Sequence, residues 1–183
     1  MGPGAVTKQA RAAGAKATSS DTRERLRRHY RPERVRILFV GEAPPVSGRF
    51  FYRADSGLYR AVRDTFLTAL PALPEDDFLS SFRALSCYLV DLCGEPVDQM
   101  DRGTRLGICR TSEVHLARTI EFLRPAAMVT LVRSIRANVE RAQDRAGWSG
   151  LHLVLPYPGR WKHHRMAFQR GLVPLLREIL SGD

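Results

Sequence analysis

The sequence predicts an α/β fold in which a central sheet of four parallel strands is covered by helices on both faces, as a three-layer α/β/α sandwich. Four short, continuous apolar runs are typical of strands buried on both faces. Segments with helical spacing of apolar residues alternate with these runs and are long enough to act as crossover connections. A length of 183 residues suits one domain.

Four segments with these apolar runs are the predicted strands: VRILFV (35–40), CYLVDL (87–92), AAMVTLV (126–132) and LHLVL (151–155). Ser56 can cap a helix that ends before PALP at 71–74. Further helices are expected from Thr111 to Pro125, at 134–147, where Gly147 closes the helix, and at 164–180. The stretch 94–108 is expected to be a loop.

Residues 1–33 are predicted to be a basic, disordered leader with a short helix, TRERLRRHY, that Asp21 can cap, and residues 34–183 are predicted to form the domain. The net charge is +10, and residues 1–36 hold ten Lys and Arg against three Asp and Glu, a net of +7. The excess charge therefore sits mostly on the leader. Such a leader is either an arm that contacts DNA or a solvated tail.

Several classes of protein are not expected from the composition. No apolar run reaches the ~18–20 residues of a membrane span, and the basic N-terminal stretch lacks the apolar segment of a secretory signal. Three cysteines without a CxxC pair favour a reducing compartment. We therefore expect a cytoplasmic protein, a monomer without contact to a membrane.

The loops that follow the strands, at 41–52, 93–110 and 156–163, are expected to form the ligand crevice, because parallel sheets bind ligands beyond their carboxyl ends. The first of them, GEAPP, combines a glycine that permits close approach with two stiffening prolines. Three aromatic residues follow in GRFFY. They can stack on a planar base or plug the top of the core.

The pattern GEAPP, GRFFY, SGLYRAV resembles motif A of the uracil-DNA glycosylase superfamily, in its branches with a GEAPG loop. CYLVDLCGEP, the helix from Cys109 to Phe122, LRPAAMVTLV and LVLPYPGRWKHHRMAF are similar to later family motifs, so the resemblance covers roughly residues 35–180. It implies an α/β/α fold. It also implies an enzyme that flips a damaged base out of DNA and cleaves the glycosidic bond of that base.

The resemblance also implies roles for residues of the first loop. Gly41, Ala43 and Pro44 would hold the extruded base, and Phe51 matches the aromatic residue that stacks on it. Glu42 is the only carboxylate left in the motif. It can orient the attacking water, or it can be a partner in a salt bridge at the strand end.

Two departures from the family concern cofactors and base recognition. Only Cys93 and Cys109 match the four cysteines of the cluster-bearing branch, so neither an iron–sulfur cluster nor any other cofactor or metal is expected. Asp91 stands near the family's base-reading Asn. A carboxylate accepts but does not donate unless it is protonated, so Asp91 suits a base edge with an N–H donor, a cation or a nearby arginine.

A third departure concerns the family's histidine motif, where this sequence has Leu155 or, in another alignment, Tyr157. His163 and His164 lie in the same loop and can replace the lost histidine as catalytic residues.

The span 155–177 holds five Lys and Arg and no Asp or Glu. Arg160, Lys162 and Arg165 are therefore expected to bind the DNA backbone. Trp161 is either a wedge that fills the space of a flipped base or a packed aromatic.

The sequence thus predicts a divergent DNA base glycosylase that hydrolyses the N-glycosidic bond of a uracil-like or deaminated base without a metal. Two alternatives stay open. One is a catalytically silent DNA-binding protein on the same fold, and the other is a hydrolase of small molecules or nucleotides.

Overall fold

The computed structural model describes residues 20–159 and 161–180. Its strands form one sheet, and they are β1 (Ile37–Gly41), β2 (Cys87–Asp91), β3 (Ala127–Thr130) and β4 (Leu151–Val154). Each neighbouring pair is parallel, and the order across the sheet is β2-β1-β3-β4. The predicted four-stranded parallel sheet is therefore confirmed.

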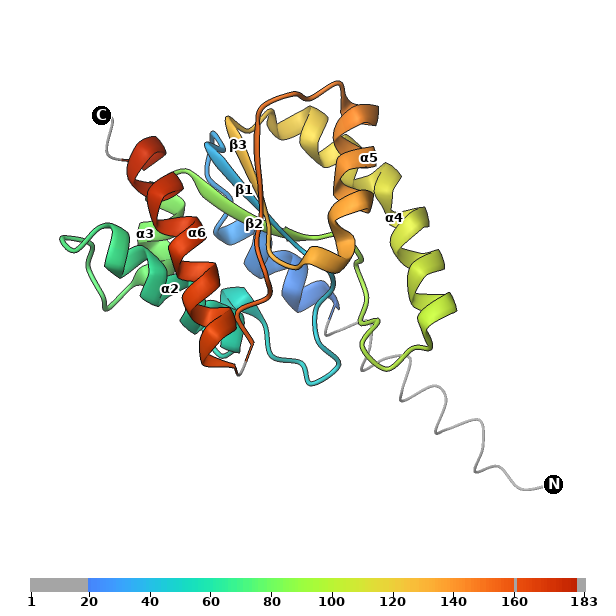
Figure 1. The fold of residues 1–183 in the computed structure, drawn as a ribbon, viewed down its shortest axis with the longest axis horizontal. Helices are drawn as coiled ribbons and strands as arrows, with labels where there is room; N and C mark the ends of the chain where they lie inside the picture. Colours follow the sequence, from blue (N-terminus) through green and yellow to red (C-terminus); the bar gives the residue numbers. More distant parts are fainter. Residues whose placement is uncertain (1–19, 160, 181–183) are drawn as a thin grey trace.

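The helices cover both faces of the sheet in a three-layer α/β/α fold (Figure 1). One layer holds α2 (Gly57–Ala69), α3 (Phe78–Ala84) and α6 (Lys162–Leu180), and the other holds α4 (Arg102–Leu123) and α5 (Arg136–Ala146). The connection from β1 to β2 runs across the sheet in one direction, and those from β2 to β3 and from β3 to β4 run in the other. Crossover connections between parallel strands are right-handed, so connections that run in opposite directions place their helices on opposite faces of the sheet.

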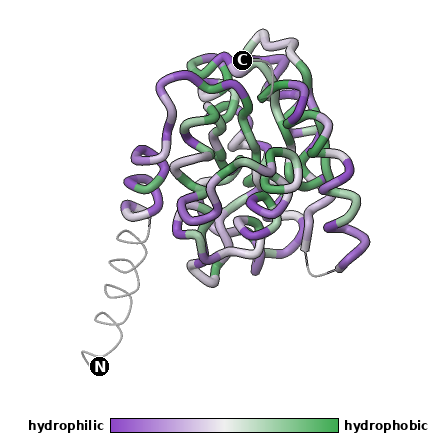
Figure 2. Tube along the Cα trace, turned by 90° about the vertical axis from the view of Figure 1, so that its left-hand side faces the viewer, coloured by the Kyte–Doolittle hydropathy of each residue, from purple (hydrophilic) through white to green (hydrophobic). Residues whose placement is uncertain are grey.

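The core lies between these layers, and its centre is β1, in which all five residues are buried. Phe39 packs there against Phe66 of α2 and Phe82 of α3, with ring centroids 6.1 and 5.4 Å away. Hydrophobic stretches run through the interior of the trace, whereas much of the outer surface is hydrophilic (Figure 2). No helix within the described ranges is long and apolar enough to cross a membrane.

Two predicted elements differ from the structure. Strand β4 was expected to be buried on both faces, but Leu151 is 50% exposed and the other three residues are only partly buried, because β4 is an edge strand with β3 as its single neighbour. Helix α4 begins at Arg102 rather than Thr111. Its cap is Asp101, whose side chain accepts a hydrogen bond from the Thr104 amide at 3.0 Å.

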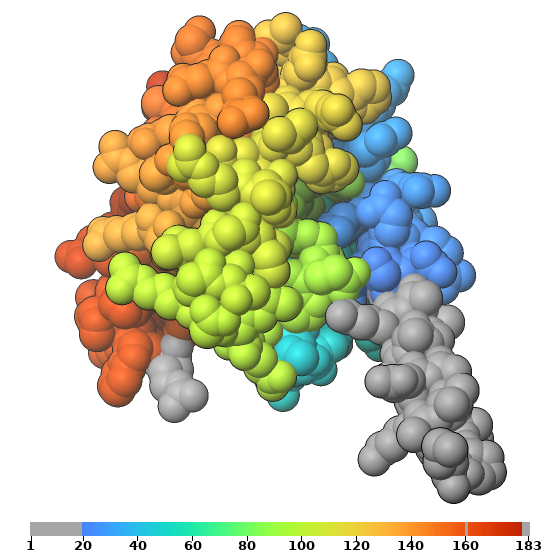
Figure 3. Space-filling view, turned by 90° about the vertical axis from the view of Figure 1, so that its right-hand side faces the viewer, coloured from blue at the N-terminus to red at the C-terminus, as the bar shows by residue number. Residues whose placement is uncertain are grey.

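Residues 20–29 are helical and lie on the β2 side of the sheet, where Arg27 of this helix contacts Asp91 at the end of β2. The ring of Tyr30, which follows this helix, stacks on that of Tyr52 with centroids 5.6 Å apart. The helix also lies against α4 (Figure 3, blue beside yellow-green). The part of the predicted leader that the structure describes therefore shares the core of the domain predicted for residues 34–183.

Candidate functional site

A cavity of about 400 Å³ lies at the carboxyl ends of the strands. Its walls include residues from the end of each strand or from the loop after it, namely Gly41, Asp91, Leu131 and Tyr157. The connections leave β1 and β3 in opposite directions, so this edge of the sheet contains the switch point at which parallel sheets bind ligands. The cavity therefore occupies the region in which the sequence predicted a crevice.

The cavity brings together the predicted base-binding residues and one of the predicted catalytic residues. These residues are Gly41, Glu42, Ala43, Pro44, Phe51 and Asp91. They come from two segments of the first loop and from the end of β2, which lies beside β1 in the sheet. The parallel pairing of β1 with β2 aligns Gly41 with Asp91, so the two strand ends meet at one point.

Phe51 forms a buried wall of the cavity rather than a platform at its rim. The side chain is only 3% exposed. Its ring packs against Tyr52, Tyr59 and Phe82, with centroids 5.1 to 5.9 Å away. The ring therefore plugs the top of the core, as one of the two expectations had it, and it also borders the cavity. Stacking on a base stays a prediction.

Glu42 makes a two-pronged ion pair with Arg105 of α4. Arg105 Nε donates to Glu42 Oε1 at 2.7 Å, and Arg105 Nη2 donates to Glu42 Oε2. The hydrogen bond to Glu42 raises the pKa of Arg105. Arg105 was missed because residues 94–108 were predicted to be a loop. The Asp101 cap was the signal for an earlier start of the helix.

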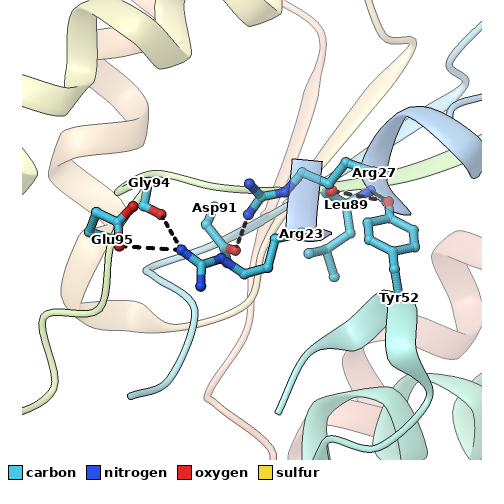
Figure 4. A network of polar contacts seen from close by, with 7 residues as sticks. All are labelled: Arg23, Arg27, Tyr52, Leu89, Asp91, Gly94 and Glu95. Carbon is cyan, nitrogen blue, oxygen red and sulfur yellow. Dashed lines mark hydrogen bonds and ion pairs between the residues drawn. The ribbon is translucent and has the colours of Figure 1, made fainter. Parts of the chain in front are cut away.

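Asp91 pairs with Arg27 of the N-terminal helix (Figure 4). Arg27 Nη2 donates to Asp91 Oδ2 at 2.6 Å, and the two side chains are 14% and 8% exposed. Burial raises the pKa of the Asp91 carboxyl, and the charge of Arg27 opposes this effect. Of the roles foreseen for Asp91, pairing with an arginine is confirmed, although sequence reasoning did not identify Arg27.

Tyr157, in the loop after β4, borders the same cavity and is 47% exposed. Burial raises the pKa of its hydroxyl, and the charge of Asp91 raises it further. The hydroxyl therefore keeps its proton at neutral pH and can donate a hydrogen bond. Leu155, the other residue aligned with the family's histidine, is 3% exposed and belongs to the core.

The predicted catalytic histidines lie outside the walls of the cavity. His163 and His164 stand in the first turn of α6, with ring centroids 4.2 Å apart. Trp161 precedes them and is 61% exposed, so it is not packed in the core. Lys162 and Arg165 are exposed on the same turn, and Arg160 lies outside the described residues.

Cys93 and Cys109 also lie close together, with their sulfur atoms 3.6 Å apart and both side chains buried. Desolvation raises the pKa of both thiols, to about 12 for Cys109, so they are protonated at neutral pH. Among the described residues, no group of three or more His, Cys, Asp or Glu side chains could hold a metal ion.

The cavity combines largely apolar walls with a few fixed polar groups, as is usual for sites that bind small organic molecules. Asp91 offers an acceptor, Tyr157 offers a donor, and the Glu42–Arg105 pair offers both. A flat ring with an N–H group on its edge would find partners there. No protein-family model matches this chain, and no curated protein sequence is similar enough to it to count as a match.

Proposed function

We propose that this protein is a DNA base glycosylase that hydrolyses the N-glycosidic bond of a damaged, uracil-like or deaminated base flipped out of DNA. One observation carries the proposal. The loop residues that resemble the uracil-DNA glycosylase superfamily, together with Phe51 and Asp91, line a single cavity at the carboxyl ends of the strands. Such enzymes take the base out of the stack and read its edge inside a pocket.

Asp91 is the group proposed to read the base edge. Its carboxylate lies in the wall of the cavity, and Arg27 holds one of its two oxygens. A carboxylate can accept two or more hydrogen bonds, so it can still accept an N–H from a base. It would repel a carbonyl oxygen at the same place, so the carboxylate is proposed to meet the ring N–H that uracil, hypoxanthine and xanthine all carry.

Cleavage needs a donor for the leaving base and a positioned water. The bond breaks through an oxocarbenium-like sugar, and the departing base carries negative charge. The protonated Tyr157 hydroxyl can donate a hydrogen bond to that charge. The Glu42 carboxylate can accept a hydrogen bond from the attacking water, while the ion pair with Arg105 fixes the carboxylate in place.

The DNA backbone is proposed to contact the start of α6. Lys162 and Arg165 are exposed there, beside the exposed ring of Trp161. The loop that carries Tyr157 leads directly into this turn, so backbone contacts and base contacts come from one segment. We also propose a monomer in the cytoplasm. The free, buried thiols of the three cysteines support a reducing compartment.

The proposal is tested with single-stranded and duplex oligonucleotides that contain uracil, hypoxanthine or xanthine, by scoring alkali-sensitive abasic sites. We expect cleavage at one or more of these bases. Glu42→Gln and Tyr157→Phe should each slow cleavage about 100-fold, because each removes a group that assists the transition state. Glu121→Gln, an exposed change on α4, is the matched control. Absence of abasic sites on every substrate with protein in excess would refute the activity.

A catalytically silent DNA-binding protein is the second candidate, and one observation favours it. The predicted catalytic histidines stand outside the cavity, and the Glu42 carboxylate is already engaged by Arg105. This candidate predicts DNA binding that weakens with salt. The slope of the logarithm of the binding constant against the logarithm of the salt concentration should decrease by about one for Lys162→Gln.

The proposed monomeric state is tested separately, by size-exclusion chromatography of the free protein.

A further inference from the structure

A second cavity, of about 480 Å³, lies between helix 20–29, strand β2 and helix α4. Asp91 borders this cavity as well as the first one, so it stands in the wall between two different spaces. The proposed glycosylase reaction uses only the first cavity. Helix 20–29 and α4 both contribute side chains to the walls of the second cavity, and the chemistry of these side chains indicates which kind of ligand it can bind.

The second cavity carries positive charge without a matching partner. Three arginines border it, namely Arg27, Arg31 and Arg118. Of the two carboxylates there, Asp91 is paired with Arg27, and Glu24 is paired with Arg28, which does not border the cavity. No described residue offers a carboxylate to Arg31 or Arg118. Two exposed guanidinium groups from different elements therefore face one space.

Arg27 has a further unmet donor. Its Nη2 is bonded to Asp91, but its buried Nε has no hydrogen-bond partner among the described residues. Buried donors of this kind are usually satisfied. The Arg27 side chain borders the cavity, so its guanidinium adds a third positive charge to the walls.

One wall of the second cavity is aromatic and open to solvent. Phe122 of α4 is 74% exposed, although it is a large apolar side chain. The Arg31 guanidinium lies over its ring, 5.8 Å from the centroid. A flat ligand ring can stack on such a pair, because arginine and phenylalanine both present planar faces.

We propose that this second cavity binds a nucleotide, with its phosphate on Arg31 and Arg118 and its base against Phe122. Arginine recognises phosphate through paired, charge-assisted hydrogen bonds, which suits two guanidinium groups that have no carboxylate partner among the described residues. A purely apolar ligand would leave these charges unmatched. The site belongs to the surface between the N-terminal helix and α4, and it does not depend on cleavage in the first cavity.

Calorimetric titration of the full chain tests the site with four probes: a purine nucleoside monophosphate, the same nucleoside without phosphate, inorganic phosphate and a short single-stranded oligonucleotide. We expect the monophosphate to bind more tightly than any other probe. Arg31→Gln and Arg118→Gln should each weaken it about five- to tenfold. The Phe122→Ala protein should bind the monophosphate no more tightly than it binds inorganic phosphate. Arg110→Gln, an exposed change on α4 outside both cavities, should have no effect.

Three results would overturn the nucleotide site. The first is equal binding of the nucleoside with and without its phosphate. The second is inorganic phosphate that binds as tightly as the monophosphate. The third is a loss of affinity for the monophosphate in Arg110→Gln as large as the loss in Arg118→Gln. The assay for abasic sites gives an independent readout, because Arg118→Gln leaves the first cavity untouched and should not alter cleavage.

Discussion

Gly41 approaches the Asp91 carboxylate so closely that a Cβ atom at position 41 would stand 2.6 Å from Asp91 Oδ1. The strand pairing places these two residues opposite one another at the end of the sheet. Arg27 holds the other oxygen of the same carboxylate. The absence of a side chain at position 41 is therefore part of what lets a buried ion pair form at the cavity wall.

The first prediction follows from this contact. Gly41→Ala should push the Asp91 carboxylate away from Arg27 and lower the free energy of unfolding by about 2–3 kcal/mol, measured by urea denaturation. Gly107→Ala is the control. It lies inside α4 with open space beside it, and it should stabilise the protein by about 0.5–1 kcal/mol. When Asp91 is also replaced by alanine, Gly41→Ala should cause almost no further loss of unfolding free energy. An undiminished loss in that double variant would exclude the contact with Asp91 as its cause.

The second prediction concerns the buried pair itself. Arg27→Met leaves the Asp91 carboxylate buried without its partner, and we expect a loss of about 3–5 kcal/mol in unfolding free energy. Arg28→Met, on the next residue of the same helix, removes only an exposed pair with Glu24 and should cost about 0.5 kcal/mol or less. Equal losses in the two variants would contradict a special role for the Arg27–Asp91 contact.

The third prediction is a pH dependence. Burial raises the pKa of the Asp91 carboxyl in the folded protein, so the folded state binds its proton more readily than the unfolded state does. The stability that Asp91 contributes is therefore fully present below the ordinary carboxyl pKa of ~4, and it is lost as the pH rises through the raised value. Asp91→Asn cannot titrate, so it serves as the reference.

Unfolding free energies of the two proteins, measured from about pH 4 to pH 7, check this expectation. Relative to Asp91→Asn, the unchanged protein should become less stable as the pH rises. A gain in relative stability over that range would mean that Arg27 outweighs burial and lowers the pKa instead.

The fourth prediction concerns a hydroxyl that covers the outer edge of β2. The Leu89 amide donates to the Tyr52 hydroxyl at 2.7 Å, and the hydroxyl donates to the Leu89 carbonyl at 3.0 Å (Figure 4). Tyr52→Phe leaves both buried backbone groups unpaired and should cost about 1–3 kcal/mol. Faster hydrogen exchange of the Leu89 amide should accompany the loss. Tyr59→Phe, whose hydroxyl has no described partner, should be close to neutral.

Much of the fold was predictable because it depends on local patterns. Apolar runs buried on both faces indicated β1, β2 and β3 close to their observed bounds, and the Ser56 cap marked the start of α2. The start of α4 was not predictable from the same patterns. The stretch 94–108 was expected to be a loop, yet Gly103 and Gly107 lie in α4, where the Asp101 cap and the packing of α4 against α5 outweigh the low helix propensity of glycine.

The site was predictable only in part, for a physical reason. Loops after parallel strands meet at one edge, so Gly41, Glu42 and Asp91 could be expected near each other. The partners Arg27 and Arg105 lie more than 60 positions away in the chain from the carboxylates that they hold. No local pattern reports a contact at that separation.

The sequence by itself determined the α/β class, the parallel sheet and the edge at which a cavity forms, because these follow from hydrophobic periodicity and short-range caps. Only the tertiary structure decided which charges are paired, that Phe51 is a buried wall, and that Tyr157 rather than His163 or His164 borders the cavity. Pairing and burial depend on which distant segments come to share one desolvated space, and that is a property of the packed chain.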